Sequence, residues 1–280
     1  MAETDLIWHF TGAQALYPIL RADGGLLATH QAFMNDASDC AHSRRVNQLM
    51  AKLLDHMIDA PDHELPNEYV EYKSGLRVGV SHSFFLACFS TEYNNPLLWR
   101  CYTPQGGFAI GISKAEFQTH LEYSTKQLCA VRRGVCSYDC WEETLHRVNA
   151  LEETFNKRIE RLTHPDCSAE EKAKILMEST NEELELEKDL AFVKHPFFET
   201  ESEYRVLYAF KDPVPIADLI VLDGKPRIKI LLSVPFSSLV RRILVSPLGN
   251  KDANLQLAQL LATSIGLPLA SVESYDAPVR

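Results

Sequence analysis

The chain has 280 residues, of which 46% are hydrophobic and 24% are charged, as is typical of a folded globular protein. It holds no apolar run of 18 residues, which predicts no membrane span, and the acidic start Met1–Asp5 lacks the order of a signal peptide. Seven irregularly spaced cysteines predict reduced thiols and a cytoplasmic protein. The net charge of −10 argues against a broad nucleic-acid or membrane surface, but it does not exclude a small basic pocket.

Hydrophobic periodicity and turn residues predict the elements of the first half of the chain. Apolar or β-branched runs predict strands at residues 6–10, 26–29, 84–90, 108–112 and 129–135. Helical spacing predicts helices at residues 15–20, 40–59, 97–102 and 114–122. The pair Gly106–Gly107 predicts an ordinary turn before a buried strand. On its own the pair is weak evidence of phosphate binding.

The second half changes character at residue 141, where Glu, Lys and Leu become frequent. Two helices are predicted at residues 141–162 and 168–192, and the charge run at residues 181–188 is expected to be a solvated helix face. Strands are expected at 201–208, 216–222, 228–232, 240–246 and 269–274, with a helix at 254–264. No internal repeat or linker is present, so the sequence predicts a single α+β domain over 1–280 with a helical insertion at 141–195.

The strand expected at 201–208 places unusual residues together. Alternation along a strand puts Glu201, Glu203 and Arg205 on one face. The opposite face then carries Tyr204, Val206 and Tyr208. One interpretation is a solvated edge-strand face with a local ion pair. The other is a polar cleft in which Arg205 orients a carboxylate that does chemistry.

Other polar residues stand in apolar surroundings. His9 lies on the first expected strand, where a core histidine satisfied by the backbone is the simpler explanation. Trp99 is explained by packing, whereas Arg100 beside it needs a reason of its own. The spacings of Cys136 with Cys140 and of His164 with Cys167 do not fit the paired ligands of a zinc site, so no metal is expected there.

Several segments, in order along almost the whole chain, carry a family resemblance. They are W-H-F-T, L-A-T, M-N-D-A-S-D, F-F-L-A-C-F-S, L-L-W-R-C-Y-T-P-Q-G-G-F-A-I-G-I, K-H-P-F-F-E-T-E-S-E-Y-R and S-Y-D-A-P-V-R. With these segments the chain resembles a widespread, mostly bacterial family known as domain of unknown function 2971. It departs from that pattern at Thr103-Pro104, where a glycine often follows the tyrosine, and at Val279, where an aromatic residue is common.

That family in turn resembles, more remotely, the ADP-ribosyltransferase superfamily. The resemblance implies a split, mostly antiparallel sheet with NAD as substrate. It also implies that His9 with Thr11 grips NAD and that Glu203, preceded by Glu201, closes the site. The aromatic residue that stacks on nicotinamide would be Tyr102 or Phe108. The candidates to meet the pyrophosphate, or to fix the glutamates, are Arg100, Arg205 and Arg280.

The expected function is therefore ADP-ribose transfer from NAD, or NAD cleavage, with Glu203 stabilising the ribose and Glu201 acting on an unknown acceptor. That acceptor is a protein, a nucleic acid or a small molecule, and toxin or phage-defence roles are common among such enzymes. One alternative is a non-catalytic sensor module that binds a nucleotide or a partner. A further alternative is a metal-dependent hydrolase or nuclease using Glu201, Glu203 and Asp36.

The transferase hypothesis makes a geometric prediction. It expects His9, Arg100, Glu203 and Arg205 to converge on one cleft although they are distant in the sequence. His9 and Glu203 on opposite faces of the sheet would contradict it.

Overall fold

The computed structural model of the chain describes residues 5–34, 45–46, 48–50, 52–53, 82–121, 128–211, 214 and 216–276. Most of the helix expected at 40–59 therefore lies outside the described residues, although the described residues within it are helical. Asp36 and Arg280 also lie outside them.

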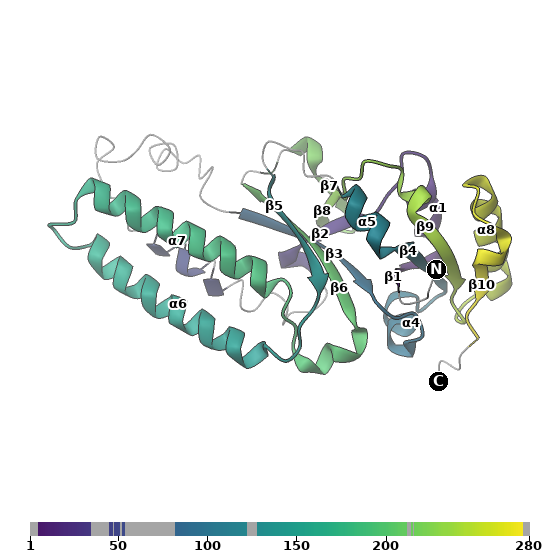
Figure 1. Cartoon of the computed structure of the whole chain (residues 1–280), viewed down its shortest axis with the longest axis horizontal. Helices are drawn as coiled ribbons and strands as arrows, with labels where there is room; N and C mark the ends of the chain where they lie inside the picture. The colour runs from purple at the N-terminus through teal and green to yellow at the C-terminus, as the bar shows by residue number, and fades with distance from the viewer. Residues whose placement is uncertain are drawn as a thin grey trace.

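A sheet of ten strands forms the centre of the molecule (Figure 1). Its main path runs β10-β9-β4-β1-β3-β2-β8-β7, and β6 pairs with β3 and β5 beside that path. Every pairing is antiparallel except that of β10 with β9, so the expected mostly antiparallel sheet is confirmed. The strands are β1 (Leu6–Gly12), β2 (Leu27–His30), β3 (His82–Ser90), β4 (Gly107–Ser113), β5 (Leu128–Val135), β6 (Glu203–Lys211), β7 (Ile220–Leu222), β8 (Lys225–Lys229), β9 (Val240–Val245) and β10 (Val272–Ser274).

The sheet forks at β3. One edge of β3 pairs with β6 over its full length, from His82 opposite Lys211 to Ser90 opposite Glu203. A strand has only two edges, so β1 and β2 share the other one. There β2 pairs near Leu86, whereas β1 touches β3 only where Trp8 lies opposite Ser90. The start of β6 therefore lies next to the point where the two branches diverge.

Four shorter helices flank the sheet, namely α1 (Leu16–Leu20), α4 (Pro96–Tyr102), α5 (Lys114–His120) and α8 (Lys251–Ser264). The strands expected at 216–222 and 269–274 instead begin with the 3₁₀ turns Ile216–Asp218 and Leu269–Ser271. Among the described helices, none is long and apolar enough to cross a membrane.

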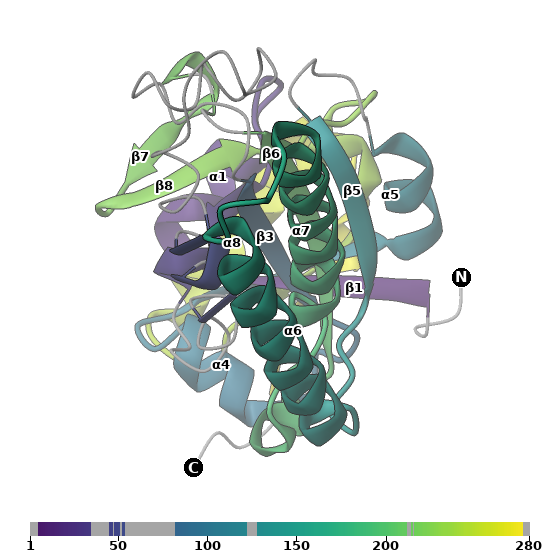
Figure 2. The ribbon, with the colours of Figure 1, turned by 90° about the vertical axis from the view of Figure 1, so that its left-hand side faces the viewer.

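Two helices of 22 residues, α6 (Trp141–Leu162) and α7 (Ala169–Leu190), extend away from the sheet as a long arm (Figure 1). Figure 2 looks along this arm from its outer end. The Ser168 side chain accepts a hydrogen bond from the Glu171 backbone and so starts α7. Both helices lie almost where the charge-rich segment predicts them.

The charge run at 181–188 is not the fully solvated face that its composition suggests. Glu183 and Glu187 are buried, on the same face of α7 as Leu186 and Leu190. Helical periodicity explains this, because positions three, four and seven apart share a face, and that face packs on α6 and on Val46. The prediction is thus wrong for Glu183 and Glu187, while the neighbouring acidic residues 182 and 185 are exposed.

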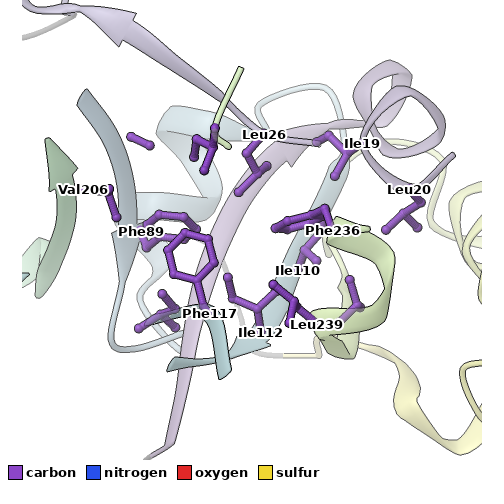
Figure 3. Packing of buried hydrophobic residues seen from close by; sticks show 14 of the residues in the cluster. Ile19, Leu20, Leu26, Phe89, Ile110, Ile112, Phe117, Val206, Phe236 and Leu239 are labelled. Atoms are coloured by element: carbon purple, nitrogen blue, oxygen red, sulfur yellow. The ribbon is translucent and has the colours of Figure 1, made fainter. Parts of the chain in front are cut away.

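The two faces of the sheet carry different packing. The larger core joins Phe89, Ile110 and Val206 to Phe117 of α5 and Phe236 of a 3₁₀ turn (Figure 3). The opposite face is covered by α4 near β1 and by the end of α7 near β6. There the buried residues are Trp8, Phe10, Leu98 and Trp99, and further along Leu207, Ala209, Ala191 and Phe192.

Candidate functional site

The start of β6 differs from the expected strand at 201–208. Residues Pro196–Glu201 form a 3₁₀ helix, and β6 begins only at Glu203. Ser202 between them has φ 46° and ψ 50°, a left-handed conformation that is uncommon for a residue other than glycine. Glu201 therefore does not share a strand face with Glu203 and Arg205, and that expectation is wrong.

Hydrogen bonds to its main-chain carbonyls fix this bent segment against the end of β3 and the chain that follows it. The Ser90 hydroxyl donates to the Glu201 carbonyl over 2.9 Å, and the Thr91 amide donates to the Ser202 carbonyl over 2.8 Å. The Asn95 side-chain amide donates to the Thr200 carbonyl. Glu201 is thus held in place by its main chain even though it precedes the strand.

A cluster of four charged side chains lies at this bend, three of them buried and Glu201 partly buried, and we call it the carboxylate cluster: Lys194, Glu201, Glu203 and Arg205. Lys194 Nζ lies 2.6 Å from Glu201 Oε2 and 2.9 Å from Glu203 Oε2. Arg205 donates from Nε to Glu203 Oε1 and from Nη2 to Glu203 Oε2, both over 3.0 Å. Two cations and two carboxylates balance in charge, which is what burial of ionised groups requires.

The ends of the helical arm supply part of this cluster. Arg205 Nη1 donates over 2.9 Å to the carbonyl of Ala191, the residue that ends α7. Lys194 follows three residues later, and its amide donates over 3.0 Å to the Ser137 carbonyl just before α6. Both roots of the arm therefore meet the carboxylate cluster.

The charges around Glu203 determine its ionisation. Burial by itself raises the pKa of a carboxyl group, but the charges of Arg205 and Lys194 outweigh burial and lower the pKa of Glu203 to about 2. The Cys88 thiol hydrogen-bonds the same carboxylate, and burial together with the Glu203 charge raises the pKa of that thiol well above its usual range. Near neutral pH, Glu203 is a carboxylate and Cys88 a thiol.

Two tyrosines border the cluster. The Glu203 amide donates over 3.0 Å to the Tyr138 hydroxyl, and burial is the main cause that raises the pKa of Tyr138 to about 12. Tyr102, the last residue of α4, has its pKa raised by burial and by the charge of Glu201. Because Tyr102 is still 41% exposed, it forms the side of the cluster that faces solvent.

His9 does not reach this cluster. Trp8 lies opposite Ser90, and Ser90 lies opposite Glu203, so these three residues point to one face of the sheet. His9 points to the other face, where its ring packs edge-on against Phe89. Its Nδ1 lies 3.3 Å from the Cys88 carbonyl, and burial lowers the pKa of the imidazole. The simpler interpretation, a core histidine satisfied by the backbone, describes what is found.

The other candidate residues are also dispersed. Thr11 is half-buried and shares the face of His9, while Arg100 is exposed on α4 and makes no ion pair within the described part of the chain. Phe108 is fully buried in the larger core, which leaves Tyr102 as the accessible aromatic residue. Of the four side chains expected to converge, only Glu203 and Arg205 meet, so the predicted single cleft is wrong.

Sequence reasoning missed three members of the site, Lys194, Cys88 and Tyr138. Lys194 opens the segment K-H-P-F-F-E-T-E-S-E-Y-R, and its place directly after the apolar run Ala191-Phe192-Val193 is a signal that could have found it. Cys88 carried a weaker signal, as the one thiol in a nearly continuous apolar strand. Tyr138 reaches Glu203 only through the folded arrangement, and its sequence context gives no sign of this.

The described residues also bear on the metal and thiol expectations. Within them, no group of three His, Cys, Asp or Glu side chains is placed to hold a metal ion. None of the cysteines in the described residues forms a disulfide bond, namely Cys88, Cys101, Cys136, Cys140 and Cys167.

Comparison with known proteins gives one match. A family model described as "Protein of unknown function (DUF2971)" matches residues 98–206, which include the last part of α4, the helical arm and the carboxylate cluster. Neither the search of curated proteins nor that of solved structures found a match. The matched segment begins inside α4 and ends one residue after Arg205, so it contains Tyr102 and the whole cluster but not His9.

Proposed function

We propose that the protein acts on NAD in the manner of an ADP-ribosyltransferase, with the carboxylate cluster and Tyr102 as its site. The observation that carries the proposal is that one ammonium, Lys194 Nζ, holds two carboxylates beside an exposed phenol. Paired carboxylates next to an aromatic surface suit a substrate whose reaction develops positive charge close to a planar ring.

The chemistry is cleavage of the bond between the ribose C1′ and the nicotinamide nitrogen. Nicotinamide leaves with the electron pair of that bond, and positive charge develops on the ribose carbon. An adjacent carboxylate stabilises this charge, and one such electrostatic interaction contributes about 10²–10³ to the rate. Water or an acceptor then attacks C1′ and gives up its proton to a carboxylate.

The geometry favours Glu201 as the carboxylate that meets the substrate. Both oxygens of Glu203 are bound by cations, and its side chain is 7% exposed. The Glu201 side chain is 13% exposed and lies nearer to solvent. This assignment moves the ribose-stabilising role, which the sequence analysis gave to Glu203, to Glu201 and leaves Glu203 to fix the site. The ring of Tyr102 then offers a stacking surface for nicotinamide.

A second candidate is a module that binds a nucleotide or a partner without turning it over. The position of His9 favours it, because the residue expected to grip NAD faces the other side of the sheet. The four balanced charges of the cluster also fit a structural role. Such a module would report binding through a change in the bent segment between Pro196 and Glu203.

The decisive experiment incubates purified protein with NAD and measures NAD loss and free nicotinamide by chromatography. We expect Glu201→Gln to lower nicotinamide release by about 100-fold or more, because it removes a carboxylate from the reacting carbon. The matched control is Glu199→Gln, which changes an exposed carboxylate on the same 3₁₀ helix and is expected to leave turnover unchanged.

Calorimetry with NAD separates the two candidates. Binding without nicotinamide release would favour the module and rule out the transferase. Full activity in Glu201→Gln would contradict the role given to that carboxylate. If NAD is neither bound nor cleaved, NAD is excluded as the ligand of this site.

A further inference from the structure

Tyr275 follows β10 in the segment S-Y-D-A-P-V-R, far from the carboxylate cluster along the sequence. Its amide donates over 2.9 Å to the Val245 carbonyl at the end of β9, so the backbone of Tyr275 continues the pairing of the sheet. The next residue, Asp276, pairs with Lys251 at the start of α8. The Tyr275 side chain is therefore presented from a backbone that the sheet and α8 hold in place.

The ring of Tyr275 packs against α4, the helix that ends with Tyr102. It stacks on the indole of Trp99, with ring centroids 5.1 Å apart and an angle of 17° between the ring planes. Trp99 is fully buried, and its carbonyl accepts hydrogen bonds from the amide and the hydroxyl of Thr103, over 3.0 and 2.7 Å. Because Tyr102 lies between Trp99 and Thr103, the stack fixes the stretch of chain that carries Tyr102.

The hydroxyl of Tyr275 reaches a second part of the site. It donates over 3.0 Å to the Asn94 carbonyl, one residue before Asn95. The Asn95 side chain caps α4 and also donates to the Thr200 carbonyl, directly before Glu201. One tyrosine thus contacts both α4 and the loop that holds the bent segment with Glu201.

We propose that Tyr275 is a positioning residue of the site: it sets where the ring of Tyr102 stands relative to Glu201. The proposal rests on the proposed function for its catalytic meaning, because these are the two groups given to NAD. The coupling from Tyr275 through α4 and Asn95 to the bent segment stands without it. A misplacement of about 1 Å costs a reaction about 10²-fold in rate, so an anchor outside the site affects turnover.

The first test needs no enzyme activity. It compares the exchange of backbone amide hydrogens in the wild type and in Tyr275→Ala, followed by mass spectrometry of peptides. We expect exchange to become about tenfold faster in α4 and in the 3₁₀ helix Pro196–Glu201, because both lose a contact that holds them. Peptides from the outer halves of α6 and α7 should exchange as in the wild type, which separates this effect from a general loss of stability.

Further variants isolate the cause. Tyr275→Phe keeps the stacked ring and loses the hydroxyl, so α4 should regain wild-type protection while Pro196–Glu201 still exchanges somewhat faster. The matched control is Tyr17→Ala, which removes a tyrosine that is 58% exposed on α1 and should leave both segments unchanged. Should Tyr275→Ala not fold, Tyr275→Leu keeps the apolar bulk without a planar ring and takes its place with the same expected result.

Activity gives the second readout. In Tyr275→Ala the KM for NAD should rise about tenfold, because a displaced Tyr102 no longer stacks on nicotinamide, and Tyr275→Phe should restore it. A purely structural role would lower kcat through a smaller folded fraction and leave KM unchanged. If the wild type releases no nicotinamide, the proposed function fails while hydrogen exchange still tests Tyr275. Wild-type exchange in either segment of Tyr275→Ala, or an unchanged KM in an active enzyme, would overturn the proposal.

Discussion

Two ion networks in this chain use the same groups in opposite surroundings. In the carboxylate cluster, Arg205 grips Glu203 through two nitrogens at 3.0 Å, with side chains 1% and 7% exposed. At the outer end of the arm, Arg161 grips Glu171 through two nitrogens at 2.7 and 2.6 Å and reaches Asp166 with a third. These side chains are 37–69% exposed. Geometry alone would rank the outer network as the stronger.

Burial reverses that ranking. Water competes for every group of the outer network and screens its charges, so breaking it leaves ions that are solvated again. A charge in the carboxylate cluster that loses its partner stays away from water, and the cost is the desolvation of an unpaired ion. We therefore expect the exposed network to be dispensable for folding, whereas the buried one ties the arm to the sheet.

The largest expected effect tests that conclusion directly. Arg205→Met leaves Glu203 with Lys194 as its remaining cation and also removes the hydrogen bond to the Ala191 carbonyl. We expect a loss of about 3–5 kcal/mol in the free energy of unfolding, measured by urea denaturation.

A companion variant separates lost charge from lost packing. Arg205→Met combined with Glu203→Gln leaves the pair of Lys194 and Glu201 balanced, so it should cost less than the sum of the two single changes. Additive costs would mean that the two residues act independently, which contradicts the cluster as described. Arg205→Lys should not restore the wild type, since an ammonium lacks the planar fork of donors.

An intermediate effect is expected from acid. The pKa of Glu203 is about 2 in the folded chain and 4.5 when unperturbed, so the unfolded chain binds the proton more readily. Unfolding then takes up a proton. The contribution of ionised Glu203 to the free energy of unfolding is complete above about pH 4.5 and is lost as the pH falls from about 4.5 toward 2. Linkage puts this loss at about 3 kcal/mol at most. Unfolding at a series of pH values in wild type and in Glu203→Gln would measure it.

Glu203→Gln provides its own reference in that experiment. The exposed carboxyls with lowered pKa, such as Asp166 and Glu171, are present in both proteins and contribute equally. The difference between the two curves therefore reports Glu203. Curves that stay parallel down to pH 3 would show that its carboxylate is not stabilised by the cluster.

The contrast also explains how far the sequence could predict the fold. Apolar alternation and helical spacing located nearly every described strand and helix, because burial of one face imposes a local period. The same logic failed at Glu183 and Glu187, whose type suggested solvent although their spacing matched Leu186 and Leu190. The prediction relied on the charged residue types, whereas the helical spacing with Leu186 and Leu190 correctly indicates burial.

The candidate site was less predictable for a physical reason. Glu203 and Arg205 meet because they are two residues apart on one strand, which is a local property. The left-handed conformation of Ser202 turns Glu201 off that strand, and serine gives no warning of it. Lys194 joins them only because α7 ends against β6. The face on which His9 lies depends on the register of β1, which places Trp8 opposite Ser90, and that register is a tertiary property.

The smallest expected effect concerns the outer network and completes the comparison. Arg161→Met removes both bonds to Glu171 and the bond to Asp166, which are more contacts than Arg205 makes with Glu203. Because these carboxylates are exposed, water replaces the guanidinium, and we expect the melting temperature to stay close to that of the wild type. Repeating the melt in 1 M salt, where charges are screened beyond about 3 Å, should erase any remaining difference. The defect of Arg205→Met should persist in the same salt, since its ions are buried. A large, salt-resistant loss in Arg161→Met would mean that the arm depends on its outer network, and that burial does not separate the two.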